Sequence, residues 1–141
     1  AFKVLEEAVR RAHHSLESAK YFQPFMILLN DTGEIELFQN ETKASTESYI
    51  LLENTLCERV KEGDVDVVVL AVDTLISEKF AKGVPTAIRL HLEEKSQAEK
   101  KISARYLYVP YELCSTGESN IHVRLYAPIA VGFPAEYIVS R

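Results

Sequence analysis

Polar and apolar residues alternate in the segment TAIRLHLEE, residues 86–94. Successive side chains of a β-strand point to opposite faces, so Arg89, His91 and Glu93 are predicted to share one face. A histidine beside a carboxylate is suited to general acid–base catalysis, because the ordinary histidine pKa lies near neutrality. His91 and Glu93, two residues apart on one strand face, are therefore catalytic candidates.

Asp73 is a third candidate, because it ends the apolar segment VVVLAVD. A charge at the end of a buried strand is often a ligand or catalytic group, although strand ends also simply return to solvent. A hydrolase-like enzyme using Asp73, His91 and Glu93 in a shallow cleft is one hypothesis, and it requires the three side chains to converge. The competing interpretation is structural, since charged side chains on a strand face commonly meet water and prevent edge pairing.

A second polar row follows in IHVRLYA, residues 121–127, and tyrosines are frequent in the strand before it. Tyrosine offers an apolar ring and a polar tip, which suits protein interfaces as well as the boundary of a core. The predicted interface residues are Arg89, His91, Tyr106, Tyr108, His122, Arg124 and Tyr126.

No metal site or cofactor is predicted. The adjacent His13 and His14 diverge by about 100° around a helix and cannot both bind one ion as an i,i+4 pair does. The two cysteines form no C-x-x-C motif, and the five glycines form no phosphate-binding loop. The net charge of −5 disfavours a nucleic-acid partner. The apolar runs FMILL and VVVLAV are too short to span a bilayer, so we expect a cytoplasmic protein.

The periodicity predicts two amphipathic helices, at residues 2–20 and 43–62. Strands are expected in a hairpin at 25–29 and 34–38, and then at 66–72, 86–94, 102–111 and 121–127. No helix-length crossover separates the later strands, so neighbours should be antiparallel. The 141 residues suit one domain. The prediction is an α+β domain, residues 1–141, with two helices and an antiparallel sheet of five to six strands in the order α-ββ-α-ββββ.

Two helices are too few to cover both faces of such a sheet. The strands at 25–29 and 66–72 are apolar on both sides and should lie in the middle, whereas those at 86–94 and 121–127 are apolar on one side only. We therefore expect the two polar rows to form one partly open surface.

The succession PFMILL, DTGEIEL, LAVD, AIRLHLEE and VPY, within residues 24–111, resembles a group of small uncharacterised bacterial proteins. That resemblance implies no activity. The order helix, hairpin, helix, antiparallel strands is also similar in topology to the roadblock and profilin-like folds, with at least one extra C-terminal strand. Members of those folds are commonly non-enzymatic dimers or scaffolding subunits, and the similarity implies such a role here.

The leading hypothesis is a non-catalytic domain that self-associates, as a two-fold homodimer, through the exposed sheet face or an edge strand. The hydrolase-like enzyme is the main alternative. A third hypothesis, an acidic protein that binds a disordered segment as secretion chaperones do, also fits the size and charge.

Overall fold

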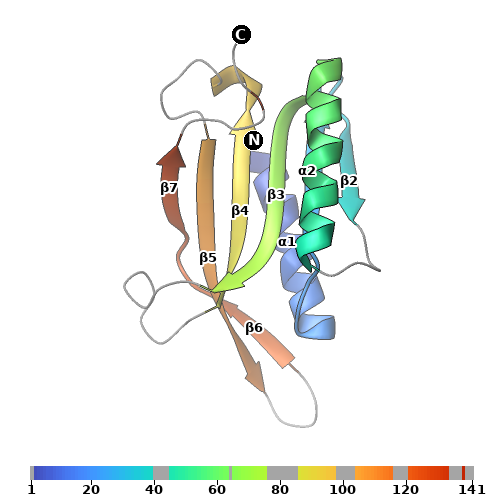
Figure 1. Ribbon diagram of the computed structural model, residues 1–141. Coiled ribbons are helices and arrows are strands. Elements are labelled where there is room, and N and C mark those ends of the chain that lie inside the picture. Colours follow the sequence, from blue (N-terminus) through green and yellow to red (C-terminus); the bar gives the residue numbers. More distant parts are fainter. Residues whose placement is uncertain are drawn as a thin grey trace.

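The computed structural model describes residues 2–39, 45–63, 65–75, 86–97, 104–115, 121–133 and 138. Its elements, in chain order, are α1 (Phe2–Ala19), β1 (Phe25–Asn30), β2 (Ile35–Gln39), α2 (Ser45–Glu62), β3 (Val65–Leu75), β4 (Thr86–Glu94), the 3₁₀ turn η1 (Lys95–Gln97), β5 (Ala104–Ser115), β6 (Ile121–Leu125) and β7 (Ile129–Phe133). The predicted α+β class and element order are confirmed (Figure 1).

The strands form one antiparallel sheet in the order β2-β1-β3-β4-β5-β6, and β7 also pairs with β5. The long strand β5 has two partners on one side: residues 104–108 pair with β7 and residues 111–115 with β6. The sheet thus has seven strands rather than the five or six that the sequence predicts. The additional strand is β7, which follows β6 after a short connection. In Figure 1, β6 and the end of β5 extend away from the rest of the sheet.

Helix α1 forms because small and apolar residues recur every four positions. Val4, Ala8, Ala12 and Leu16 are all 0% exposed, which places one continuous stripe against the sheet. The helix ends at Lys20, whose φ of 69° is left-handed and whose N–H donates to the Leu16 carbonyl at 2.9 Å. This is a helix C-cap made without glycine.

The β1–β2 hairpin closes around the Asn30 side chain. Its Oδ1 accepts hydrogen bonds from the N–H groups of Thr32, at 3.0 Å, and Glu34, at 2.9 Å. Gly33 has a φ of 86°, a conformation that other residues adopt at a cost. Turn chemistry of this kind fixes which residues of the two strands face each other.

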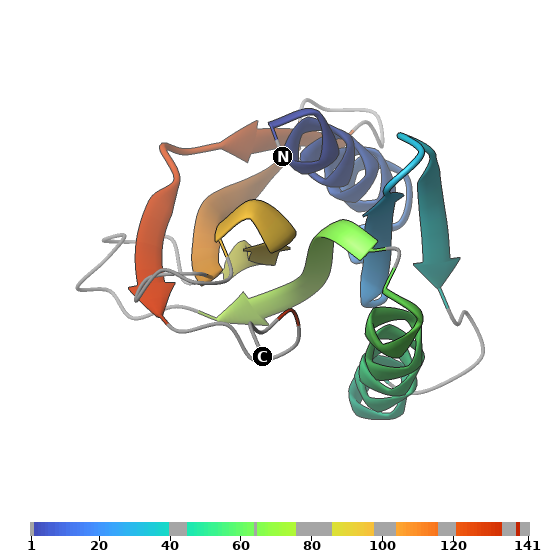
Figure 2. The same ribbon diagram turned by 90° about the horizontal axis from the view of Figure 1, so that it is seen from above.

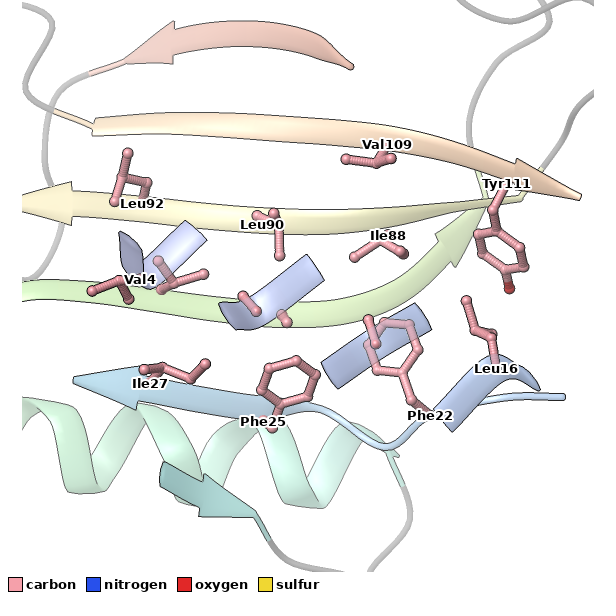
Figure 3. Close-up of a cluster of buried hydrophobic side chains, with 14 of the residues drawn as sticks. Val4, Leu16, Phe22, Phe25, Ile27, Ile88, Leu90, Leu92, Val109 and Tyr111 are labelled. Atoms are coloured by element: carbon pink, nitrogen blue, oxygen red, sulfur yellow. The ribbon is translucent and has the colours of Figure 1, made fainter. Parts of the chain in front are cut away.

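Two apolar clusters lie on opposite faces of the sheet. The larger lies beneath α1 and includes Phe25 and Ile27 of β1 and Ile88 and Leu90 of β4 (Figure 3). The smaller lies beneath α2. Its members from the helix and the sheet are Met26, Leu28, Leu52, Leu56, Val65, Val68 and Leu70, and Ile138, which follows the last strand, joins them. The central strands β1 and β3 are therefore covered on both faces, as the sequence predicts.

The helices cover the two faces unequally. Helix α1 packs on β1, β3, β4 and β6, whereas α2 packs on β1, β2 and β3 (Figure 2). On the face of the sheet where α2 packs, the helix consequently does not extend over most of β4 and β5. This part of the face carries the polar row of β4.

Candidate functional site

The row on β4 lies on the α2 face of the sheet. His91 is opposite Leu70 of β3 and Tyr106 of β5, and Glu93 is opposite Val68. The prediction that Arg89, His91 and Glu93 share one face is thus consistent with the strand register. The prediction that this row is open is wrong for two of its members, because His91 is 1% exposed and Glu93 is 0% exposed.

His91 and Glu93 form a buried pair. Nε2 of His91 lies 2.6 Å from Oε2 of Glu93, and the other carboxyl oxygen, Oε1, accepts a hydrogen bond of 2.8 Å from the N–H of Ile138. The His91 ring also contacts the Tyr106 ring edge-on, with centroids 5.1 Å apart. A carboxyl group out of reach of water requires such partners, because desolvation without hydrogen bonds is costly. This geometry indicates a structural pair that holds residue 138 against the sheet.

Arg89 has a different environment. Its guanidinium carbon lies 5.0 Å from the Tyr106 ring centroid and 5.7 Å from that of Tyr49 on α2. Both contacts are in the range of cation–π interactions. The Nε atom of Arg89 is buried, and it makes no hydrogen bond within the part of the chain that the structure describes. Among the described residues, the cation is thus held by rings and not by a carboxylate.

A pocket of about 260 Å³ opens beside Arg89. It lies between the first turns of α2, the segment before β1 and the ends of β3 and β4. Its lining is mainly apolar and includes Phe22, Ile50 and Val72, and its two charged residues are Arg89 and Asp73.

Asp73 does not join His91 and Glu93. It pairs in register with Ile88, which belongs to the α1 cluster, and its Oδ1 accepts a hydrogen bond of 2.6 Å from the hydroxyl of Tyr111. The Tyr111 ring lies in the α1 cluster too (Figure 3). The three catalytic candidates therefore fail to converge, which removes the geometric basis of the hydrolase-like hypothesis.

The electrostatics of the Asp73–Tyr111 pair follow from partial burial. Loss of hydration raises the pKa of Asp73, and the hydrogen bond from Tyr111 opposes that rise. The pKa of Tyr111 is also raised, first by desolvation and then by its hydrogen bond to the Asp73 carboxylate. Both shifts are those of a partly buried polar pair at the border of the α1 cluster, where the buried part of β3 ends.

The second polar row does not continue the first. Among the described strands, β6 pairs with β5 alone and is two strands away from β4. His122 is exposed, and its Nδ1 lies 3.9 Å from Oε2 of Glu17 on α1. Arg124 stacks over Tyr126, with its guanidinium carbon 5.3 Å from the ring centroid. The single open surface expected from the sequence is therefore two separate regions, and the tyrosines 106 and 108 line only the first of them.

The described residues contain no cluster of three or more potential metal ligands. Cys57 and Cys114 are free thiols. Within the same part of the chain, neither helix has the length and apolar character needed to cross a membrane.

No protein-family model, curated protein or solved structure matches this chain. The resemblance to a bacterial group and to the roadblock and profilin-like folds stays a prediction, and the function must be inferred from the geometry.

Proposed function

We propose that this chain is a small non-catalytic interaction domain that forms a two-fold homodimer through the outer edge of β2. The observation that carries the proposal is an unprotected apolar edge. Among the described strands β2 pairs with β1 alone, and its outward side chains Ile35 and Leu37 are 42% and 41% exposed. An edge strand with free backbone groups and apolar side chains favours pairing with another strand.

The usual protections of an edge are missing from β2. Its five residues, IELFQ, contain no lysine or proline, and its register with β1 runs without a bulge. The charge of Glu36 is engaged by Arg59 of α2, with N–O distances of 3.0 and 2.7 Å. The opposite edge differs, because it consists of two short strands separated by Pro128 and carries the exposed His122 and Arg124.

A two-fold axis through Leu37 gives a favourable register. Leu37 then faces its own symmetry copy, Ile35 faces Gln39, and Glu36 faces Phe38. Because Glu36 does not face Glu36, like charges stay apart. The α1-side surface of β2, which α1 leaves uncovered, becomes continuous across the dimer.

A cytoplasmic location is part of the proposal. Free thiols such as Cys57 and Cys114 are typical of a reducing compartment.

Sedimentation velocity at micromolar concentration tests the dimer. The wild-type protein should sediment as a species of twice the chain mass of 16.0 kDa, and Leu37→Lys should sediment as a monomer because two lysines would face each other. Val131→Lys on β7 is the matched control, since Val131 is 43% exposed and lies on the other edge. A monomeric wild type contradicts the proposal. Loss of the dimer in Val131→Lys alone moves the interface to the face formed by β5 and β7.

A further inference from the structure

The pocket beside Arg89 combines a positive charge with an apolar wall, and it is separate from the β2 edge. We propose that it binds a small monocarboxylate with an apolar body, of the size of an arylacetic acid. The carboxylate pairs with the Arg89 guanidinium, and the apolar body lies against the wall of the pocket. This binding goes beyond the interaction role proposed above and does not depend on the dimer.

Arg89 is held in place before any ligand arrives. Its guanidinium carbon lies 5.7 Å from the ring centroid of Tyr49, which also lines the pocket, and 5.0 Å from that of Tyr106. A side chain fixed in this way loses little entropy when a ligand binds. The rings attract the charge but supply no oxygen acceptor, and the buried Nε has no hydrogen-bond partner among the described residues. A planar cation with unused donors recognises carboxylates, because its fork matches the two oxygens.

The second charged residue of the lining, Asp73, does not neutralise Arg89. The register pairs Asp73 with Ile88, a member of the α1 cluster. It pairs Arg89 with Val72, one residue earlier on β3, so the two charged side chains point to opposite faces of the sheet. Oδ1 of Asp73 accepts its hydrogen bond from Tyr111, whose ring lies in the α1 cluster (Figure 3). On the α2 face, the charge that the lining offers to a ligand is therefore that of Arg89.

This distribution of charge favours an anion with a single negative charge. One guanidinium neutralises one carboxylate. A second negative charge on the ligand would leave water without a partner in the lining and would lie close to the Asp73 carboxylate, which makes its binding costly.

The remaining lining sets the size and character of the ligand body. Phe22, Ile50 and Val72 give the pocket a mainly apolar wall, and Tyr49 adds a ring on which a ligand can stack. The pocket has a volume of about 260 Å³. An apolar cavity of about 150 Å³ is sufficient for a benzene ring, so the pocket has room for one ring and a short arm that carries the carboxylate.

Three matched probes test the role of the charge. Phenylacetate has one carboxylate, phenylacetamide has the same shape without the charge, and phenylmalonate has a second carboxylate. Titration of the ¹⁵N-labelled protein to millimolar probe, followed by amide chemical shifts, should show saturable changes around the pocket with phenylacetate. Phenylacetamide should bind more weakly on the order of tenfold or more, as expected when a hydrogen bond between charged groups is lost. Phenylmalonate should bind no more tightly than phenylacetate.

The same titrations can overturn the proposal. No saturable change with phenylacetate contradicts the site, and equal binding of phenylacetamide contradicts recognition of a carboxylate. Tighter binding of phenylmalonate contradicts the preference for a single charge.

Replacement of the cation locates the binding. Arg89→Met keeps an apolar stem between the two rings and should weaken phenylacetate binding on the order of tenfold or more, while leaving phenylacetamide binding nearly unchanged. Arg124→Met is the matched control, because Arg124 also stacks on a tyrosine yet does not line the pocket. It should leave the binding of both probes unchanged. Equal affinity of Arg89→Met and wild type for phenylacetate contradicts the proposed contact.

A second pair of variants tests the pocket without removing Arg89. Ile50 lines the pocket and is 51% exposed, whereas Leu51, its neighbour on α2, is 40% exposed and does not line it. Ile50→Glu adds a carboxylate that repels the ligand and competes for Arg89, so phenylacetate should bind more weakly than to Leu51→Glu. Far-UV circular dichroism verifies the fold of each variant, and this comparison decides the matter if Arg89→Met does not fold. Equal phenylacetate affinity of the two glutamate variants contradicts binding in this pocket.

Discussion

Replacement of Glu93 by alanine should lower the free energy of unfolding by about 3–5 kcal/mol, the usual result when one partner of a buried pair is removed. The contacts that are lost include the 2.6 Å hydrogen bond with His91 and the 2.8 Å hydrogen bond from the Ile138 N–H. Loss of a hydrogen bond to a buried polar group costs about 1–3 kcal/mol, so these two together give about 2–6 kcal/mol. The two ranges agree.

The double variant His91→Leu/Glu93→Met separates the pair from its surroundings. It removes both polar groups and keeps apolar volume, so it should be more stable than Glu93→Ala, because exchange of a whole buried pair for apolar residues is often close to neutral. Glu94→Ala is the control at the next position, which is partly exposed, and it should change stability by less than about 0.5 kcal/mol. Urea unfolding followed by circular dichroism measures all three. A loss below about 1 kcal/mol in Glu93→Ala would refute the conclusion that the pair is sealed and structural.

Three further predictions follow from single positions. Lys20→Gly should raise the free energy of unfolding by about 0.5–1 kcal/mol in thermal denaturation. Relief of the left-handed φ of 69° is worth about 1–2 kcal/mol, which exceeds the entropic cost of a more flexible glycine in the unfolded chain. A lower stability of the variant would contradict this. Leu56 is 0% exposed, so Leu56→Ala should lower the free energy of unfolding by about 2–5 kcal/mol in the urea assay. Leu51 is 40% exposed, so Leu51→Ala should lower it much less. Similar losses in the two variants would show that the buried face of α2 is assigned wrongly. The raised pKa of Asp73 means that its carboxyl favours folding when protonated, so its contribution to stability falls as the pH rises from about 4. Asp73→Asn keeps an acceptor for Tyr111 and should flatten that part of the urea midpoint profile, and an unchanged profile would count against the pair.

Alternation along β4 was sufficient to predict that Arg89, His91 and Glu93 share a face. The burial of His91 and Glu93 on that face was not predictable from the alternation, because a prediction based on helices alone considers no other segment that could cover the sheet. Ile138, which seals Glu93, lies in a segment without helical or strand periodicity, and its contact is made by a backbone N–H that no residue type identifies. A buried backbone donor of this kind leaves no signal in a single sequence.

The position of Asp73 shows a second limit. Whether Asp73 and His91 lie on the same face depends on where each falls in its own strand and on the register between β3 and β4, which pairs Asp73 with Ile88 and His91 with Leu70. A shift of one residue would reverse the face. Tyr111, the partner of Asp73, was recognisable as one of several tyrosines but not as the residue in reach of it. The strand β7 was missed because its five residues, IAVGF, are few and include a glycine, which weakens the strand signal.

Hydrogen exchange at two protein concentrations tests the proposed β2 interface most directly. If β2 pairs with its symmetry copy, the amide groups of residues 35–39 that do not bond to β1 should exchange more slowly at high concentration, while those of β7 should exchange at the same rate at both concentrations. Concentration-independent exchange in β2, or slowing confined to β7, would contradict the proposed dimer.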